Sequence, residues 1–187
     1  MRALIGLHDA LFDRLATVGD WLMPLFARFV FAATLLVYYW ASAVTKLGDG
    51  ILGILSPSVG AYAQIFPRQF EAVGYDSSQL TLFHWAVVTA GTLAEFILPA
   101  LIVIGLATRL AALGMIGFVL VQSLTDYYGH GLTDPATVGR WFDRLPDGVL
   151  LDQRLFWVFL LTFIMVRGAG VFSIDAALRR RTSPLAA

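Results

Sequence analysis

The sequence predicts an all-α fold, a polytopic membrane four-helix bundle, and two observations support this class. Four long stretches are almost wholly apolar, and each is near the roughly 20 residues that a helix needs to cross a hydrocarbon core. They cover about residues 23–45, 82–106, 110–125 and 155–174. In addition, 58% of the residues are hydrophobic and only 14% are charged, whereas soluble domains carry about 25% charged residues.

Charge and cysteine content exclude several classes of function. The formal net charge is +0, so no overall positive field attracts nucleic acid. The chain has 0 cysteines, which excludes disulfides, thiolate chemistry, Cys-ligated zinc and cysteine-bound iron–sulfur clusters. We therefore expect the lipid bilayer and a membrane or peripheral protein as partners, and no nucleic acid.

Residues 1–21 are expected to form an amphipathic interfacial helix. Apolar residues recur there at helical spacing, and they are Leu4, Leu7, Leu11, Leu15 and Val18. Such a segment lies on a membrane surface or docks on a partner protein, and the two alternatives predict similar sequences. The apolar run after Arg2 is too short for a cleavable signal peptide.

The membrane domain is expected over residues 22–178. Pro24 suits the first turn of the first helix, where its missing N–H costs nothing. Lys46 closes that helix and is expected to anchor it at the membrane interface. Glycines, prolines and apolar residues then alternate over 47–79, which predicts one or two short helices on the bilayer surface.

The second half of the membrane domain is a predicted hairpin followed by a fourth helix. Only residues 106–109 join the second and third helices, so these two are expected to be antiparallel neighbours. A second long connection spans 126–153 and contains a predicted short helix over 135–145. The fourth helix ends near Gly168, and a basic tail over 179–187 completes the chain.

Lysine and arginine near the helix ends predict the orientation in the membrane. One side holds Arg2, Arg14, Arg109 and the cluster Arg179, Arg180 and Arg181. The opposite side holds acidic residues as well as the basic residues Lys46, Arg68, Arg140, Arg144 and Arg154. The sequence thus predicts that both termini are cytoplasmic and that both long connections lie outside.

Three charged residues lie inside the apolar stretches, namely Arg28, Glu95 and Arg167. A charge at mid-bilayer costs at least about 2.5 kcal/mol, so it is kept where it faces the bundle interior and finds a partner. We therefore expect Glu95 to pair with Arg28, with Arg167 or with both. Such a cluster either holds the helices in register and does no chemistry, or it is catalytic and handles a proton or a ligand carbonyl.

A ligand site is predicted beside Glu95 on the second helix. Pro99 has no N–H and leaves the carbonyl of Glu95 without its helical donor. Gly91, about one turn earlier, lets a flat ligand approach. Tyr39 and His84 are expected near the outer mouth of the site. The expected apolar walls are Leu35, Val88 and Phe163.

No metal site is predicted. His84 and His130 both fall on the outer side of the membrane, and two facing histidines are able to ligate haem or copper. Because they lack any motif spacing, interfacial hydrogen bonding is the favoured interpretation.

Three motifs mark the ends of the predicted helices. The first is Ala94-Glu95-Phe96-Ile97-Leu98-Pro99-Ala100-Leu101 followed by Gly105-Leu106-Ala107-Thr108-Arg109. The second is Arg28 with Ser42 and Lys46-Leu47, and the third is Gly168, Gly170, Ser173 and Asp175. Together, over about residues 25–178, they resemble the DoxX family of small four-helix membrane proteins. The chain departs from that family at Ala43, where glycine is usual.

The resemblance implies a bacterial inner-membrane protein whose motif residues include Lys46, Arg109, Gly168, Gly170, Ser173 and Asp175. Some members of the family are quinone-reducing subunits or accompany membrane oxidoreductases, and most have no assigned activity. It thus implies an integral subunit of an oxidoreductase system, with quinone or another apolar compound as the ligand. The alternative is a non-catalytic membrane scaffold or assembly factor that holds a partner complex through residues 3–20 and the outer connections.

Overall fold

The structure is a computed structural model that describes residues 1–182 of the 187-residue chain. All of its regular elements are helices, and no strand occurs among the described residues. Four helices are long and apolar enough to cross a membrane, and they are Leu4–Thr45, Leu82–Ile104, Thr108–Gly129 and Val149–Arg167. The predicted all-α class and the predicted four apolar helices are therefore confirmed.

These four spans are built from α-helices joined in places to single π-helical turns. The first comprises α1 (Arg2–Phe31), the π turn η1 (Ala32–Leu36) and α2 (Val37–Thr45). The others comprise α5 (Leu82–Ile104), then α6 (Thr108–Leu124) with η3 (Thr125–Gly129), and η4 (Val149–Gln153) with α8 (Arg154–Arg167). The short elements are α3 (Val59–Ile65), α4 (Pro67–Ala72), η2 (Ser77–Gln79), α7 (Pro135–Val138) and α9 (Ile174–Thr182).

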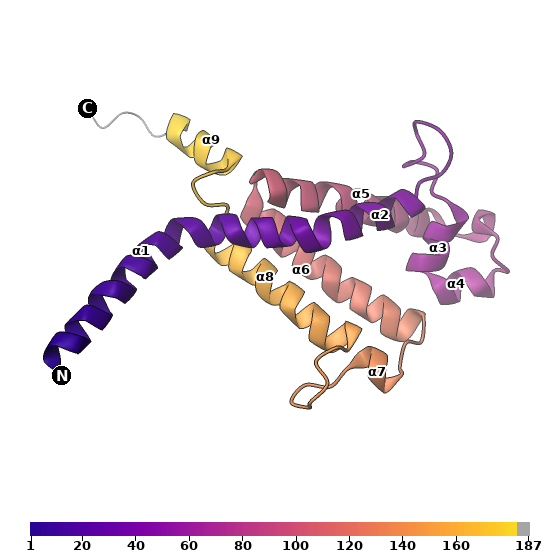
Figure 1. Cartoon of the computed structure of the whole chain (residues 1–187). Coiled ribbons are helices and arrows are strands. Elements are labelled where there is room, and N and C mark those ends of the chain that lie inside the picture. The colour runs from indigo at the N-terminus through magenta and orange to yellow at the C-terminus, as the bar shows by residue number, and fades with distance from the viewer. Residues whose placement is uncertain (183–187) are drawn as a thin grey trace.

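The long helices converge at one end of the molecule and splay at the other (Figure 1). We call the first the terminus end, because α1 begins and α9 ends on that side of the bundle. The second is the connection end, which carries α3, α4 and α7. Helix α6 packs against α5 and α8, while α2 packs against α5 and α1 against α8. Toward the connection end, α2 and α5 diverge from α6 and α8 (Figure 1).

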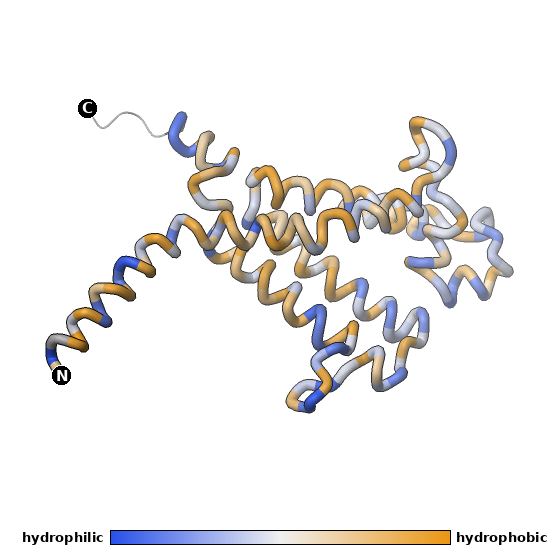
Figure 2. Tube along the Cα trace, in the orientation of Figure 1, coloured by the Kyte–Doolittle hydropathy of each residue, from blue (hydrophilic) through white to orange (hydrophobic). Residues whose placement is uncertain are grey.

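Helix α1 is continuous through Pro24, so the prediction of a first-turn proline is wrong. Pro24 has no N–H to donate to the carbonyl of Asp20, and an interior proline is a common cause of helix bending. Figure 1 shows α1 bending away from the bundle toward its N-terminus. The Asp20 carboxylate pairs with Arg167 at the end of α8, which fastens α1 to α8. Apolar and polar residues alternate along the projecting part (Figure 2).

The π turn η1 keeps one face of the first span against the core. Its buried apolar residues recur every fourth position, as Ala27, Phe31, Leu35, Tyr39 and Ala43. In a regular helix of 3.6 residues per turn such a stripe rotates by about 40° with each step. The wider π turn offsets part of this rotation. Buried residues of the first span therefore stay in contact with those of α5, α6 and α8.

The two long connections differ in how well the sequence predicted them. The short helices expected in the first are present as α3 and α4, and Tyr62 and Phe70 pack them onto Val88 of α5. In the second, the expected helix over 135–145 is wrong, because α7 ends at Val138. Gly139 follows with φ +78, a conformation that ends the helix.

Candidate functional site

Arg28 is buried at the terminus end, where it binds backbone carbonyls and not Glu95. Its Nε donates to the carbonyl of Ile102 at 3.0 Å, and its Nη2 donates to that of Val103 at 2.5 Å. Nη1 donates to the carbonyls of Ala169 and Phe172 at 2.9 and 2.7 Å. The last carbonyls of a helix lack helical partners, and a cation there is stabilising. Arg28 thus fastens the end of α5 to the segment that follows α8.

Other motif residues complete this junction. Gly105 has φ +74, and a Cβ at that position would lie 2.5 Å from Cβ of Ser173, so only glycine fits. The Asp175 carboxylate accepts from the N–H groups of Ala107 and Thr108 at 2.8 and 3.0 Å. Burial alone would raise the pKa of Asp175, but these N–H donors prevail and lower it. The role supported for these residues is structural.

The remaining motif residues lie at the same end of the molecule. Arg109 is exposed, and its Nε lies 3.2 Å from where a Cβ on Gly168 would be. Gly170 has φ +74 and packs against Pro24. Arg167, expected near Glu95, is instead the exposed partner of Asp20. The prediction that Glu95 pairs with Arg28 or Arg167 is therefore wrong.

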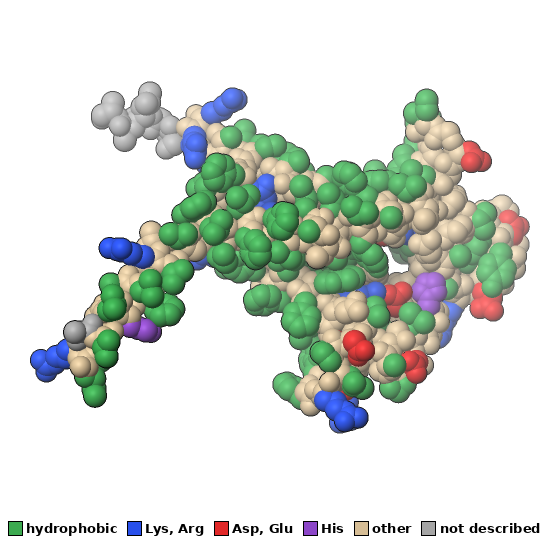
Figure 3. Space-filling view, in the orientation of Figure 1, with side chains coloured by type: hydrophobic (Ala, Val, Ile, Leu, Met, Phe, Trp, Pro, Cys, Tyr) green, Lys and Arg blue, Asp and Glu red, His purple; other side chains and the backbone are tan. Residues whose placement is uncertain are grey.

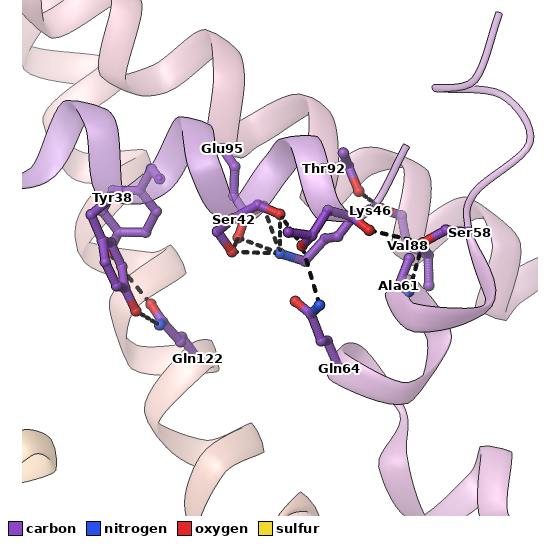
Figure 4. Close-up of polar contacts among 12 residues, drawn as sticks. Tyr38, Ser42, Lys46, Ser58, Ala61, Gln64, Val88, Thr92, Glu95 and Gln122 are labelled. Carbon is purple, nitrogen blue, oxygen red and sulfur yellow. Dashed lines mark hydrogen bonds and ion pairs between the residues drawn. The ribbon is translucent and has the colours of Figure 1, made fainter. Parts of the chain in front are cut away.

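The partner of Glu95 is Lys46. The Lys46 ammonium donates to Glu95 Oε2 at 2.9 Å and to Oε1 at 3.0 Å. It also donates to the Ser42 hydroxyl at 2.7 Å, and that hydroxyl donates to Glu95 Oε1 at 3.2 Å. Lys46 and Glu95 are each only 4% exposed, so Lys46 is not the interfacial anchor that its position suggested. Figure 4 shows the three side chains converging between α2 and α5.

This ion pair lies in the wall of a cavity of about 600 Å³ between α2, α3, α5 and α6. Figure 3 shows the surface hollowed in this region, with acidic, basic and histidine side chains close by. The lining residues are Tyr38, Ser42, Lys46, Gln64, Ile65, Val87, Ala90, Gly91, Ala94, Glu95, Leu98, Gly114, Gly117, Phe118, Val121, Gln122, Thr125, Asp126 and His130.

The predicted ligand residues meet this cavity only in part. Glu95 and Gly91 line it, as expected. Tyr39, His84 and Pro99 do not, and neither do the expected walls Leu35, Val88 and Phe163. Tyr38, Val87 and Leu98, which precede Tyr39, Val88 and Pro99, line it instead. The depth of the site along a helix was therefore predicted better than the rotation of the helix about its axis.

Small residues on two helices create the open space. Helix α5 contributes Ala90, Gly91 and Ala94, and α6 contributes Gly114 and Gly117. A Cβ on Gly114 would lie 3.1 Å from Leu98, so this glycine brings α5 and α6 together. A Cβ on Gly117 would have nothing within 4 Å. Gly117 therefore faces free space that a larger side chain would fill.

The connection-end part of the cavity is polar. The ring nitrogen Nε2 of His130 lies 2.9 Å from the carbonyl oxygen of Gln64, and Gln122 donates to the Tyr38 hydroxyl at 2.9 Å. Asp126 pairs with the buried Arg154 of α8. These contacts join residues far apart in the sequence and link α2, α3, α6 and α8 around the cavity.

The two outer histidines serve different local structures. His84 lies 2.8 Å from the Thr81 hydroxyl at the start of α5, whereas His130 binds α3. Among residues 1–182, no group of three or more His, Cys, Asp or Glu side chains is arranged to hold a metal ion.

Comparison with known proteins gives no relative: no family model, no curated protein and no solved structure matches the chain.

Sequence reasoning gave Lys46 only as a motif residue and an interfacial anchor, and it missed Lys46 and Ser42 as the partners of Glu95. The signal that could have found them is their spacing of four residues, which puts both on one face of α2. Lys46 ends the first span, but its long side chain reaches back along the helix to Ser42 and Glu95.

We predict that Lys46 and Glu95 are energetically coupled. Lys46→Met leaves a buried carboxylate without its cation and should lower the free energy of unfolding by about 3–5 kcal/mol. The double variant Lys46→Met with Glu95→Met removes both charges at similar volume and should recover most of that loss. Unfolding of the purified protein in detergent micelles measures both.

Arg68→Met is the matched control, since Arg68 is exposed on α4 and its loss should change stability by no more than about 0.5 kcal/mol. A double variant no more stable than Lys46→Met alone would show that the two residues are not coupled.

Proposed function

We propose that this chain is an integral membrane protein that binds an apolar ligand with a polar head group, of the quinone class, in the cavity beside Lys46 and Glu95. The observation that carries the proposal is the coincidence of a buried ion pair with a cavity of about 600 Å³. Small-molecule sites commonly have about 300–1,000 Å³, mostly apolar walls and a few polar groups.

Each part of the cavity has a role in this proposal. Ile65, Leu98 and Phe118 offer apolar surface to a ring or a tail. Gly91 and Gly117 leave room for a flat group. Ser42, Lys46 and Glu95 are the polar groups that fix the head of the ligand. Lys46 replaces Arg28 and Arg167 in the role first expected of those arginines.

The wider context is an oxidoreductase system of a bacterial inner membrane. This part of the proposal rests on the resemblance of the motifs to the DoxX family. The ligand-binding part rests on the cavity and its ion pair, so it can be tested independently of the oxidoreductase context.

A second candidate function is a non-catalytic scaffold or assembly factor. The projecting part of α1 favours it, since that segment lies outside the bundle and exposes Leu4, Leu7 and Leu11 (Figure 1). Ile51 and Phe142 in the two long connections are also fully exposed. Under this hypothesis these side chains contact a membrane or peripheral partner protein, or lie on the lipid surface.

Both termini are proposed to be cytoplasmic. The start of α1 and helix α9 lie on the same side of the bundle (Figure 1), as an even number of spans requires. The same end carries Arg14, Arg109 and the arginines of α9, and cytoplasmic segments of inner-membrane proteins are enriched in such residues.

Filling the cavity should abolish ligand binding. Gly117→Leu places a side chain in open space and replaces a helical glycine with a better helix former, so the protein should remain folded. The wild-type protein, extracted from its membrane in mild detergent, should carry an apolar quinone-class compound. The variant should carry at least about tenfold less, as measured by mass spectrometry of the extract.

Gly6→Leu is the control, because Gly6 is a helical glycine of α1 that also faces open space and lies far from the cavity. Equal ligand content in all three proteins, or none in the wild type, would contradict ligand binding in the cavity. Loss of a co-purifying protein on deletion of residues 2–20 would then support the scaffold.

Reporter fusions test the orientation. A reporter active only in the periplasm should be inactive when fused after Ala187 and active when inserted within residues 134–148. A cytoplasmic reporter should give the reverse pattern. An active periplasmic reporter at Ala187 would invert the proposed orientation.

A further inference from the structure

We infer that the wall of the cavity formed by the Lys46–Glu95 ion pair selects a ligand whose head group donates a hydrogen bond. Such a head group is a neutral hydroxyl, as in a phenol or a quinol. A head group that only accepts hydrogen bonds, such as a carbonyl or an ether, should bind more weakly. This inference rests on the proposed function. It follows from the hydrogen-bond donors and acceptors of Lys46, Ser42 and Glu95 that remain free once these three residues have bonded to one another.

The ammonium of Lys46 has no N–H to spare. An ammonium has three donors, and three acceptors lie within 3.0 Å: the Ser42 hydroxyl at 2.7 Å and the two Glu95 oxygens at 2.9 and 3.0 Å. The carbonyl of Ser42, at 3.2 Å, is a fourth acceptor. A ligand carbonyl must therefore displace one of these bonds to reach Lys46.

The Ser42 hydroxyl is committed as well. Its single O–H donates to Glu95 Oε1 at 3.2 Å, while the hydroxyl oxygen accepts from Lys46. Neither Ser42 nor Lys46 thus offers a donor to the cavity. Any ligand atom that reaches this triad meets only acceptors.

Glu95 retains accepting capacity. A carboxylate has about four lone-pair sites, and three are used, by Lys46 twice and by Ser42 once. Glu95 lies 13 positions after Leu82, about 20 Å along α5. A hydroxyl that donates to the remaining site therefore anchors the ligand deep in the span, away from water.

Charge balance favours a neutral hydroxyl over a cationic donor. Lys46 cancels Glu95, and Arg154 cancels Asp126, so the cavity has no net charge to neutralise an ammonium group. Burying an unpaired charge against Leu98 and the other apolar walls would be costly. Amide donors remain on Gln64 and Gln122, nearer the connection end, where they can bind a second polar group of the ligand.

The test compares two probes that differ in one group. 4-Nonylphenol carries a hydroxyl, and 1-fluoro-4-nonylbenzene carries a fluorine of similar size that cannot donate. Calorimetric titration of the full chain in detergent micelles should show the phenol binding about tenfold tighter, a difference of about 1.4 kcal/mol. Titration of Gly117→Leu gives the background from partition into micelles.

Two variants probe the cause of the preference. Glu95→Gln replaces one acceptor oxygen by an N–H donor and should abolish the preference for the phenol. Ser42→Ala is a smaller change that should keep the fold, since Ser42 is only half-buried. The backbone carbonyl of residue 42 can accept the N–H of Lys46 that loses the hydroxyl, and Glu95 gains a free lone pair, so the preference should persist.

The outcomes separate this inference from the proposed function. Equal binding of the two probes by the wild type, blocked by Gly117→Leu, would overturn the inference and leave ligand binding intact. Loss of the preference in Ser42→Ala would also overturn it. Binding of neither probe above the Gly117→Leu background would contradict the proposed function itself.

Discussion

A charge inside a bilayer needs a partner, and the pairing of Lys46 with Glu95 is the interaction on which this account depends. The pair ties α2 to α5 at 2.9 Å and is almost fully buried. Without Lys46, the Glu95 carboxylate would be isolated in a low-dielectric medium, at a cost that the fold could not easily absorb. The same pair lies in the wall of the cavity between α5 and α6. The pair that stabilises the fold is thus also the pair that we propose recognises the ligand.

The two ends of the molecule have different structural roles. At the terminus end, Arg28 and Asp175 satisfy backbone groups at the ends of α5 and α6, which holds the long helices together. At the connection end, the helices splay (Figure 1), and the small residues Gly91 and Gly117 leave the cavity open. Because the helices are fixed to one another at the terminus end, they can separate around the cavity at the connection end and still form a bundle.

The sequence predicts the helices and the depth of the site, because apolar length and the position of a charge along a helix can be read from residue order. It therefore identified Glu95 and Gly91. It did not predict the partner of Glu95, because that depends on the rotation of each helix and on side-chain reach. The π turn η1 changes the rotation of the first span, and Lys46 reaches back from the helix end to Glu95. The π turn has no marker in the sequence, whereas the four-residue spacing of Ser42 and Lys46 shows only that the two share a face of the helix.

Infrared difference spectroscopy tests the central claim most directly, because it observes the Glu95 carboxylate itself. Spectra of the protein with and without 4-nonylphenol would be recorded for the wild type and for Glu95→Gln. Binding should shift a carboxylate stretching band in the wild type, because a new hydrogen bond reaches Glu95. This change should be missing from the variant. Binding with identical difference spectra in the two proteins would contradict the claim that Glu95 holds the head of the ligand.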